Sequence, residues 1–285
     1  SLTVTFVSTS YCRATLAALR LAAVAVFTTA CETPVQPLVY RVPDLLYDTS
    51  TEAATPTYLW SNTSDAYLMQ MRSRHGLAEI AGGNTTLAKI VAVTRWTHGR
   101  FKHDGSNASR FADPMGILDE AAQGKRMRCV EYAAVVSGAL TSVGIPARSV
   151  WLLLADEATR GDAVAHVVAE AWVAELGRWV MVDAQWDAIP TVDGIPVSVL
   201  ELQRALARRD PRAQVLTSSG TSSTSYLAWV APYLHYLLSP VDARVGVTRA
   251  PGYVILAPSG DRSLANKYPP PSLITHHIRT FYPQL

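Results

Sequence analysis

Apolar residues in the middle of the chain recur at helical spacing and predict a helix that begins at Cys129. On one face of this helix lie the small or apolar residues Ala133, Val136, Leu140 and Val143. Gly144 follows at a position where a left-handed residue commonly ends a helix, and Pro146 prevents the helix from continuing. The pattern therefore predicts a helix over residues 129–143, preceded by a loop that contains Gly124.

Three apolar segments after this helix have the pattern of strands. Residues 148–154 form a strand that is apolar over most of its length, residues 165–173 alternate like a strand, and residues 179–183 resume the strand pattern after a turn at residues 176–178. The second and third strands are expected to form a hairpin. Alternation places His166 on the same face as Val168 and Glu170, although the turn length leaves the register open.

Weaker patterns predict the remaining elements. Helices are expected over residues 65–76, 84–96, 117–122 and 197–208, a β-hairpin over residues 245–257 and a further strand at residues 274–281. Residues 217–225 are rich in serine and threonine and predict a mobile loop. The aromatic-rich segment 226–238 is expected to be core, and a hydrophobic groove near the site is the alternative. Helices and strands together indicate an α+β fold.

Cys129 stands where the chain can make a thiol reactive. A side chain in the first turn of a helix lies near unpaired N–H groups and the positive end of the helix dipole. Both favour the thiolate, which is the nucleophilic form, and Lys125, Arg126 and Arg128 add positive charge beside it. The alternative is a purely structural Cys129, because a lone cysteine is by default a small buried hydrophobe.

His166 and Asp183 are the expected partners of this thiol. A catalytic thiolate needs a base, and the imidazole of that base needs an acceptor that fixes its tautomer. The predicted hairpin brings Asp183 back beside His166. Glu170 lies about 13 Å away along an extended strand, and Asp187 lies past the strand end, so Asp183 is the best partner.

These motifs resemble the core of the transglutaminase-like superfamily. They are G-x4-C-x14-GIPAR, a histidine that opens a strand, and W-V-M-V-D-A-Q-W, and they extend over about residues 85–190. The resemblance implies a papain-like fold, with the nucleophile at a helix N-terminus packed on an antiparallel sheet. It also implies a triad in which Cys129 is the nucleophile, His166 the general base and acid, and Asp183 the residue that orients His166.

Two details of the resemblance concern single residues. The family usually has an aromatic residue two positions after the histidine, where this chain has Val168, and Trp172 is expected to supply some of that packing. Gln123 lies six residues before Cys129, the offset at which papain-like enzymes place an oxyanion-hole glutamine. A surface glutamine at a helix end is the alternative for Gln123.

Composition and charge narrow the classes of function. The net charge is +2, and residues of both signs are scattered along the chain. Because the chain has no basic block interleaved with aromatic residues, we do not expect a nucleic-acid partner. The three cysteines are Cys12, Cys31 and Cys129, and neither a CxxC motif nor a histidine pair is spaced for zinc. We expect neither a metal nor an organic cofactor.

The first 31 residues resemble a bacterial export signal. Two arginines precede a short apolar run, which is too short to span a membrane, and small residues lead to Cys31. A lipoprotein-type signal would make Cys31 the lipidated N-terminus and anchor the protein to the membrane of the cell envelope. An ordinary signal peptide or an amphipathic helix is the alternative. Export would leave Cys129 as a single free thiol, which catalysis explains better than a disulfide framework does.

The sequence therefore predicts four segments. Residues 1–31 are a signal peptide, residues 32–60 a tether rich in proline and threonine, residues 61–190 the catalytic core, and residues 191–285 a C-terminal α/β extension packed on it. The expected function is cysteine-dependent acyl transfer at amide bonds of peptides or proteins, with hydrolysis favoured over transfer to an amine. The alternative is a non-catalytic envelope module that uses the same fold to bind proteins.

Overall fold

The computed structural model describes residues 41–50, 56–162, 164–248 and 250–285, which lie within one compact unit, Leu38–Leu285. The predicted signal peptide and Cys31 lie outside the described residues. Within the described ranges, no helix combines the length and the apolar character that a membrane span requires. Of the predicted tether, residues 41–50 and 56–60 run along the domain, where Asp48 bridges to His277 and Leu59 to Asp242.

In the part of the chain that the structure describes, five helices precede the first strand of the main sheet. They are α1 (Ala66–Arg74), α2 (Leu77–Ile80), α3 (Thr86–His98), α4 (Pro114–Ala122) and α5 (Cys129–Ser142). Capping explains several boundaries: the Thr85 side chain accepts a hydrogen bond from the third residue of α3, and Asp113 does the same for α4. Gly144 has a φ of 87°, a conformation that favours glycine, and it lets the chain turn from α5 into the sheet.

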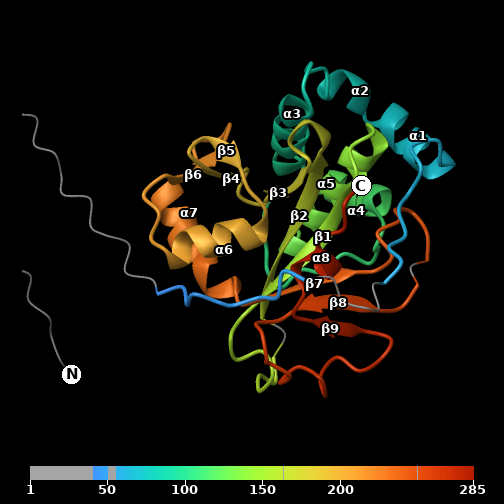
Figure 1. The fold of residues 1–285 in the computed structure, drawn as a ribbon. Coiled ribbons are helices and arrows are strands. Elements are labelled where there is room, and N and C mark those ends of the chain that lie inside the picture. The colour runs from blue at the N-terminus through green and yellow to red at the C-terminus, as the bar shows by residue number, and fades with distance from the viewer. Residues whose placement is uncertain (1–40, 51–55, 163, 249) are drawn as a thin grey trace, which may run out of the picture. The chain divides into compact units, whose positions relative to one another are not determined.

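The main sheet has six strands. They are β1 (Ala147–Leu153), β2 (Ala165–Val173), β3 (Arg178–Val182), β7 (Tyr236–Pro240), β8 (Tyr253–Leu256) and β9 (Leu273–Thr275), in the order β3-β2-β1-β7-β8-β9. Neighbouring strands are antiparallel except β8 and β9, which are parallel. Because β7 pairs directly with β1, the C-terminal part of the chain continues the same sheet (Figure 1). The α+β class predicted from the sequence is confirmed.

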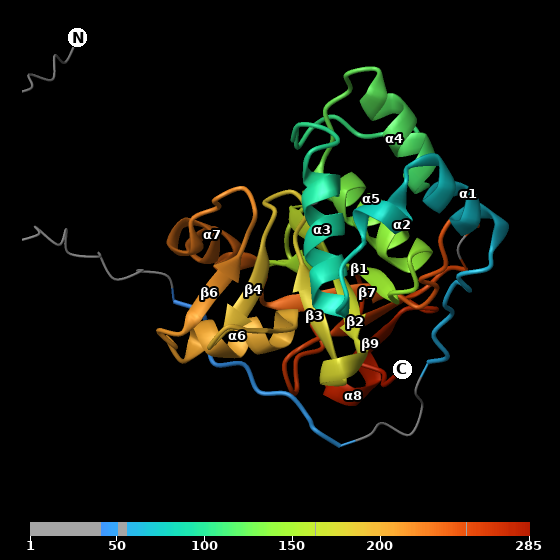
Figure 2. The same cartoon turned by 90° about the horizontal axis from the view of Figure 1, so that it is seen from above.

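A second, smaller sheet lies beside the first. It consists of β4 (Ile189–Val192), β5 (Ile195–Pro196) and β6 (Ala213–Leu216), in the order β5-β4-β6. Helices α6 (Val199–Ala207) and α7 (Ser223–Val230) accompany it (Figure 2). The described residues also contain the short helices η1 (Ala174–Leu176), η2 (Ala231–Tyr233) and α8 (Ile278–Phe281).

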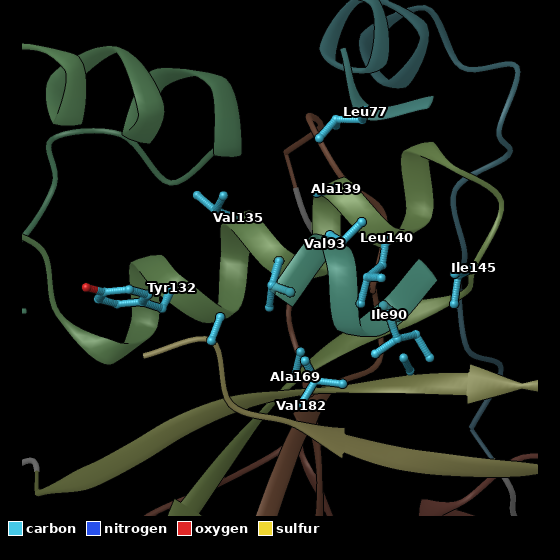
Figure 3. Packing of buried hydrophobic residues seen from close by; sticks show 14 of the residues in the cluster. Leu77, Ile90, Val93, Tyr132, Val135, Ala139, Leu140, Ile145, Ala169 and Val182 are labelled. Atoms are coloured by element: carbon cyan, nitrogen blue, oxygen red, sulfur yellow. The ribbon is translucent and has the colours of Figure 1, made fainter. Parts of the chain in front are cut away.

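The two faces of the main sheet are covered by different helices. On one face, α3 and α5 pack on alternate residues of β2 and β3, so that Val93 and Leu140 belong to one core with Ala169 and Val182 (Figure 3). On the other face, residues of α6, α7 and α8 pack against Val168, Met181 and their neighbours. This alternation follows from the two-residue period of a strand, and it places His166 on the second face.

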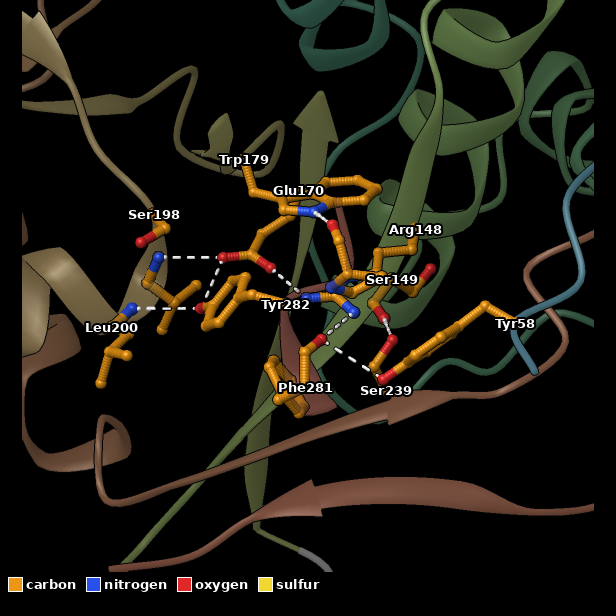
Figure 4. Close-up of polar contacts among 12 residues, drawn as sticks. Tyr58, Arg148, Ser149, Glu170, Trp179, Ser198, Leu200, Ser239, Phe281 and Tyr282 are labelled. Atoms are coloured by element: carbon orange, nitrogen blue, oxygen red, sulfur yellow. Dashed lines mark hydrogen bonds and ion pairs between the residues drawn. The ribbon is translucent and has the colours of Figure 1, made fainter. Parts of the chain in front are cut away.

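The second face also contains a fully buried ion pair. Arg148 on β1 stands directly opposite Glu170 on β2, and their side chains meet at 2.9 Å with no exposed surface (Figure 4). Arg148 also donates to the carbonyl of Phe281, while Glu170 accepts from the Tyr282 hydroxyl and the backbone N–H of Val199. The pair thus joins the sheet to α6 and to the C-terminal segment.

The C-terminal third corrects three sequence predictions. Residues 245–248 are not a strand, and β8 pairs with β7 and β9 instead of forming the expected hairpin. The predicted strand at residues 274–281 ends at Thr275 and gives way to α8, because the backbone of Asp48 bonds to His276 and Ile278. The predicted mobile loop contains the start of α7, which the side chain of Ser222 caps.

Candidate active site

Cys129 is the first residue of α5 and is partly buried. Its sulfur lies 4.0 Å from the carbonyl oxygen of Ala165, the first residue of β2. Arg128 precedes it in an extended conformation, and its backbone N–H donates to the Glu131 carboxylate, which returns from the first turn. The structure therefore places the thiol at the start of the helix, beside the start of the strand that carries His166.

The register of β2 and β3 brings His166 and Asp183 together. Ala169 pairs with Val182, which places Asp183 diagonally across from His166 on the same face. The distance from His166 Nε2 to Asp183 Oδ2 is 2.6 Å, and both side chains are almost fully buried. Cys129 also acts on the protonation of His166, so the two side chains are neighbours, and Nδ1 is the ring nitrogen that the Asp183 contact leaves available to the thiol.

Asp183 is held by four hydrogen bonds. Oδ1 accepts from the backbone N–H groups of Gln185 and Trp186, and Oδ2 accepts from the Tyr226 hydroxyl at 2.8 Å besides contacting His166. Burial, and then the nearby Asp183 charge, raise the pKa of Tyr226 well above its usual value, so Tyr226 remains a neutral donor. Because both carboxylate oxygens of Asp183 have hydrogen-bond partners, the carboxylate is fixed in one orientation toward His166.

His166 is held in its charged form by its partners. Burial disfavours the imidazolium, but the Asp183 carboxylate and then Cys129 outweigh this effect and raise the pKa of His166 to about 9. His103 lies on the segment that bonds to Met127, just before Cys129. Burial first, and then the charge of His166, lower the pKa of His103, so these two histidines carry different charges at neutral pH.

Aromatic residues that the sequence assigned to the core cover His166. Trp229 meets its ring edge to face at 4.7 Å, and Tyr233 lies 6.2 Å away. With Tyr226, these residues have the spacing of one helix face, a signal that could have suggested a shared role. Trp172 does not replace the expected aromatic residue near His166, because it packs on Trp179 near the other end of the hairpin.

One expected feature of the site is corrected. The three cations before Cys129 are each paired with a carboxylate, Lys125 with Glu120, Arg126 with Asp104 and Arg128 with Glu131, so their charge is largely offset. Trp179 of β3 stacks on Trp60 and donates to the Pro283 carbonyl.

Among the described residues, none of the remaining candidates bonds to His166 or Asp183. Gln123 ends α4 with an exposed side chain, and no hydrogen bond of that side chain is found in the described ranges, so its oxyanion role stays a prediction. Glu170 binds Arg148, and Asp187 accepts from Ser218. Among the residues that the structure describes, no group of three or more metal-binding side chains is arranged to hold an ion.

Comparisons with known proteins match part of the chain. Residues 75–184 match the model of the transglutaminase-like superfamily. A proposed cysteine protease from Cytophaga hutchinsonii is 15% identical over 53% of this chain and 47% of its own, with a TM-score of 0.34. A TGase is 16% identical over 44% of this chain and 34% of its own, with a TM-score of 0.31. Red sea bream transglutaminase is 13% identical over 70% of this chain and 40% of its own, with a TM-score of 0.32.

The aligned part spans less than half the length of each of these three structures. No curated protein matches the chain significantly. The matched segment runs from the C-terminal end of α1 to the residue after Asp183, and it contains Cys129 and His166. The resemblance to the transglutaminase-like superfamily that the motifs in the sequence indicated is therefore confirmed over residues 75–184.

Proposed function

We propose that the protein is a thiol enzyme that cleaves amide bonds of peptides or proteins through an acyl-enzyme intermediate. The Cys129 thiolate attacks the amide carbonyl carbon and forms a C–S bond. As the C–N bond breaks, His166 gives its proton to the departing amine. The neutral imidazole then takes a proton from water, whose oxygen forms the new C–O bond while the C–S bond breaks and the thiolate returns.

One observation carries this proposal. The Cys129 thiol, the His166 imidazole and the Asp183 carboxylate form one connected chain of contacts, in which Nε2 of His166 lies 2.6 Å from Asp183. Asp183 fixes the tautomer and orientation of His166, which leaves Nδ1 to exchange a proton at the sulfur. Transfer of the acyl group to an amine would use the same first step, and water is favoured because no second-substrate site is identified.

The pH dependence of iodoacetamide alkylation at Cys129 tests the activated pair. An ordinary thiol ionises near pH 8.5, so its rate changes roughly 100-fold between about pH 6 and pH 8. We expect a nearly flat rate over this interval, because the imidazolium is retained below its pKa of about 9 and stabilises the adjacent thiolate. His166→Ala should restore the steep dependence. Peptide mass spectrometry separates labelling at Cys129 from labelling at the other two cysteines.

The same measurement distinguishes the non-catalytic alternative. A protein-binding module has no need for an ionised thiol, so a steep wild-type profile that His166→Ala leaves unchanged would favour the non-catalytic alternative.

Acyl transfer should also slow at high pH. Since the pKa of His166 is raised from 6.5 to about 9, its charged form and the stability it contributes are present below pH 6.5 and are lost as the pH rises through about 9.

Tyr226 is expected to tune His166 through Asp183. Tyr226→Phe removes one of the two donors on Oδ2, so the carboxylate attracts the imidazolium more strongly and the pKa of His166 rises by up to about one unit. NMR titration of His166 measures this shift. Tyr236→Phe is the matched control, because Tyr236 also donates to an aspartate, but to Asp261 and not to the Asp183 that binds His166. Equal titration curves for wild type and Tyr226→Phe would remove Tyr226 from this role.

A further inference from the structure

A large cavity opens beside the first turn of α5. Its volume is about 940 Å³, near the upper end of the range for small-molecule sites. Arg128 and Val130, the two neighbours of Cys129 in the chain, line it together with Trp151 of β1 and Tyr253 of β8. The cavity therefore begins at the helix turn that carries the thiol and extends over the sheet.

A second cavity adjoins the first on the other side of these aromatic residues. Its volume is about 250 Å³, and Trp151 and Tyr253 line both cavities, with their rings edge to face at 6.2 Å. Ala165 lines the second cavity, and its carbonyl oxygen is the atom 4.0 Å from the Cys129 sulfur. Cys129 itself lines neither cavity, but its chain neighbours line the first and Ala165, which its sulfur approaches, lines the second; we refer to the two cavities together as the groove.

Apolar side chains converge on this groove although they are accessible to water. Phe111, Val247 and Tyr253 are 44%, 48% and 39% exposed, and all three line the larger cavity. They come from three separate segments, so the patch is not a property of one helix or strand. Exposed apolar side chains gathered in a concave surface are typical of binding sites.

Contacts of Tyr67 fix one wall of the groove. The Tyr67 hydroxyl donates to Asp113 at 2.6 Å, and Gly246 packs so closely on the Tyr67 ring that a side chain there would overlap it. Tyr67 therefore ties together the segments that carry Phe111 and Val247. This arrangement presents the apolar patch before any ligand binds, which lowers the entropic cost of binding.

We infer that this groove binds the substrate as an extended peptide segment with a large apolar side chain within a few residues of the reactive amide. The inference rests on the proposed function, because the proximity of Cys129 to residues that line the two cavities is what identifies the occupant as the substrate. Val247 and Tyr253 lie outside the superfamily match, so the C-terminal part of the chain determines this specificity.

Protection of Cys129 from iodoacetamide tests the groove with the full chain. The competitors are short blocked glycine peptides in which phenylalanine replaces one glycine at each position in turn, so that either side of the amide is sampled. We expect at least one phenylalanine peptide to slow alkylation at a concentration roughly 10- to 100-fold below that of the all-glycine peptide. Val247→Ser and Tyr253→Ser should each reduce this advantage, and Leu176→Ser, an exposed residue that lines neither cavity, should retain it.

The outcomes separate this inference from the proposed function. Equal protection by all peptides, or an advantage that Val247→Ser and Tyr253→Ser leave intact, would overturn the groove assignment even when alkylation depends on His166. An alkylation rate without peptide that is ordinary and independent of His166 would overturn the proposed function itself. The rate without peptide also verifies that the groove variants keep the arrangement around Cys129.

Discussion

Replacing Glu170 with alanine is expected to lower the free energy of unfolding by about 3–5 kcal/mol. Arg148 has no exposed surface, so its guanidinium cannot exchange the lost carboxylate for water. The remaining hydrogen bond to the Phe281 carbonyl does not neutralise the charge, and Nε of Arg148 already lacks a partner. Chemical denaturation measures the loss, and the Tm should fall by roughly 10 °C.

The expected loss exceeds that of a surface pair because of what surrounds Arg148. Its guanidinium carbon lies 4.6 Å from the ring centre of Phe281, 4.8 Å from that of Trp179 and 5.2 Å from that of Tyr282. These rings favour a cation, but they exclude the water that would otherwise screen it. Glu170→Ala also leaves the Tyr282 hydroxyl and the Val199 N–H without their acceptor, which loosens the C-terminal segment and α6.

Arg178→Ala is the matched control. Arg178 pairs with Glu201 at 3.4 Å on the surface, with side chains 42% and 39% exposed. Arg178→Ala should lower the free energy of unfolding by at most about 1 kcal/mol, because water replaces the lost partner of Glu201. A Glu170→Ala protein as stable as Arg178→Ala would show that water reaches Arg148 and that the ion pair does not fasten the sheet to the C-terminal segment.

The sequence predicted the elements that carry the candidate site more accurately than the contacts between them. Gly144 and Pro146 placed the end of α5, and alternation gave the bounds of β2, because both signals are local. The register of β2 against its neighbours depends on pairing between distant residues. Arg148 and Glu170 were therefore recognisable only as charges on two strands, and their direct pairing came from the structure.

The same limit explains what was missed around His166. Tyr226 and Trp229 are more than 40 residues from Asp183 and His166 in sequence, and their aromatic pattern is equally compatible with an ordinary core. The hairpin expected at residues 245–257 failed for a related reason. Pro251-Gly252 is a good local turn signal. However, β8 pairs along both of its edges, with β7 and with β9, and so does not form a hairpin with residues 245–248.

Asp183→Asn is expected to slow turnover of an amide substrate by on the order of 10⁴-fold, the loss that this substitution causes in a Ser-His-Asp triad. Both carboxylate oxygens accept hydrogen bonds, and asparagine replaces one oxygen with an NH₂ donor. At the Oδ1 position, the NH₂ would oppose the backbone N–H groups of Gln185 and Trp186, which cannot turn away. The amide therefore directs its NH₂ toward His166.

This orientation reverses the tautomer of His166. Nε2 must accept from the new NH₂ group, so the single proton of the neutral ring moves to Nδ1, the nitrogen left available to Cys129. An Nδ1 that already carries a proton cannot take one from the thiol, and the loss of the Asp183 charge removes the main interaction that stabilises the imidazolium. Iodoacetamide alkylation near pH 6 should therefore fall together with turnover, and it should resemble that of His166→Ala.

Asp187→Asn separates this effect from a general disturbance of buried carboxylates. Asp187 is also buried and lies four residues from Asp183, but its carboxylate accepts hydrogen bonds from Thr217 and Ser218 instead of contacting His166. Its substitution should leave alkylation of Cys129 near the wild-type rate at about pH 6, far below the usual thiol ionisation. If Asp187→Asn slows the reaction as much as Asp183→Asn does, the orientation of His166 is not set by Asp183. If neither variant slows it, the imidazole needs no acceptor to activate the thiol.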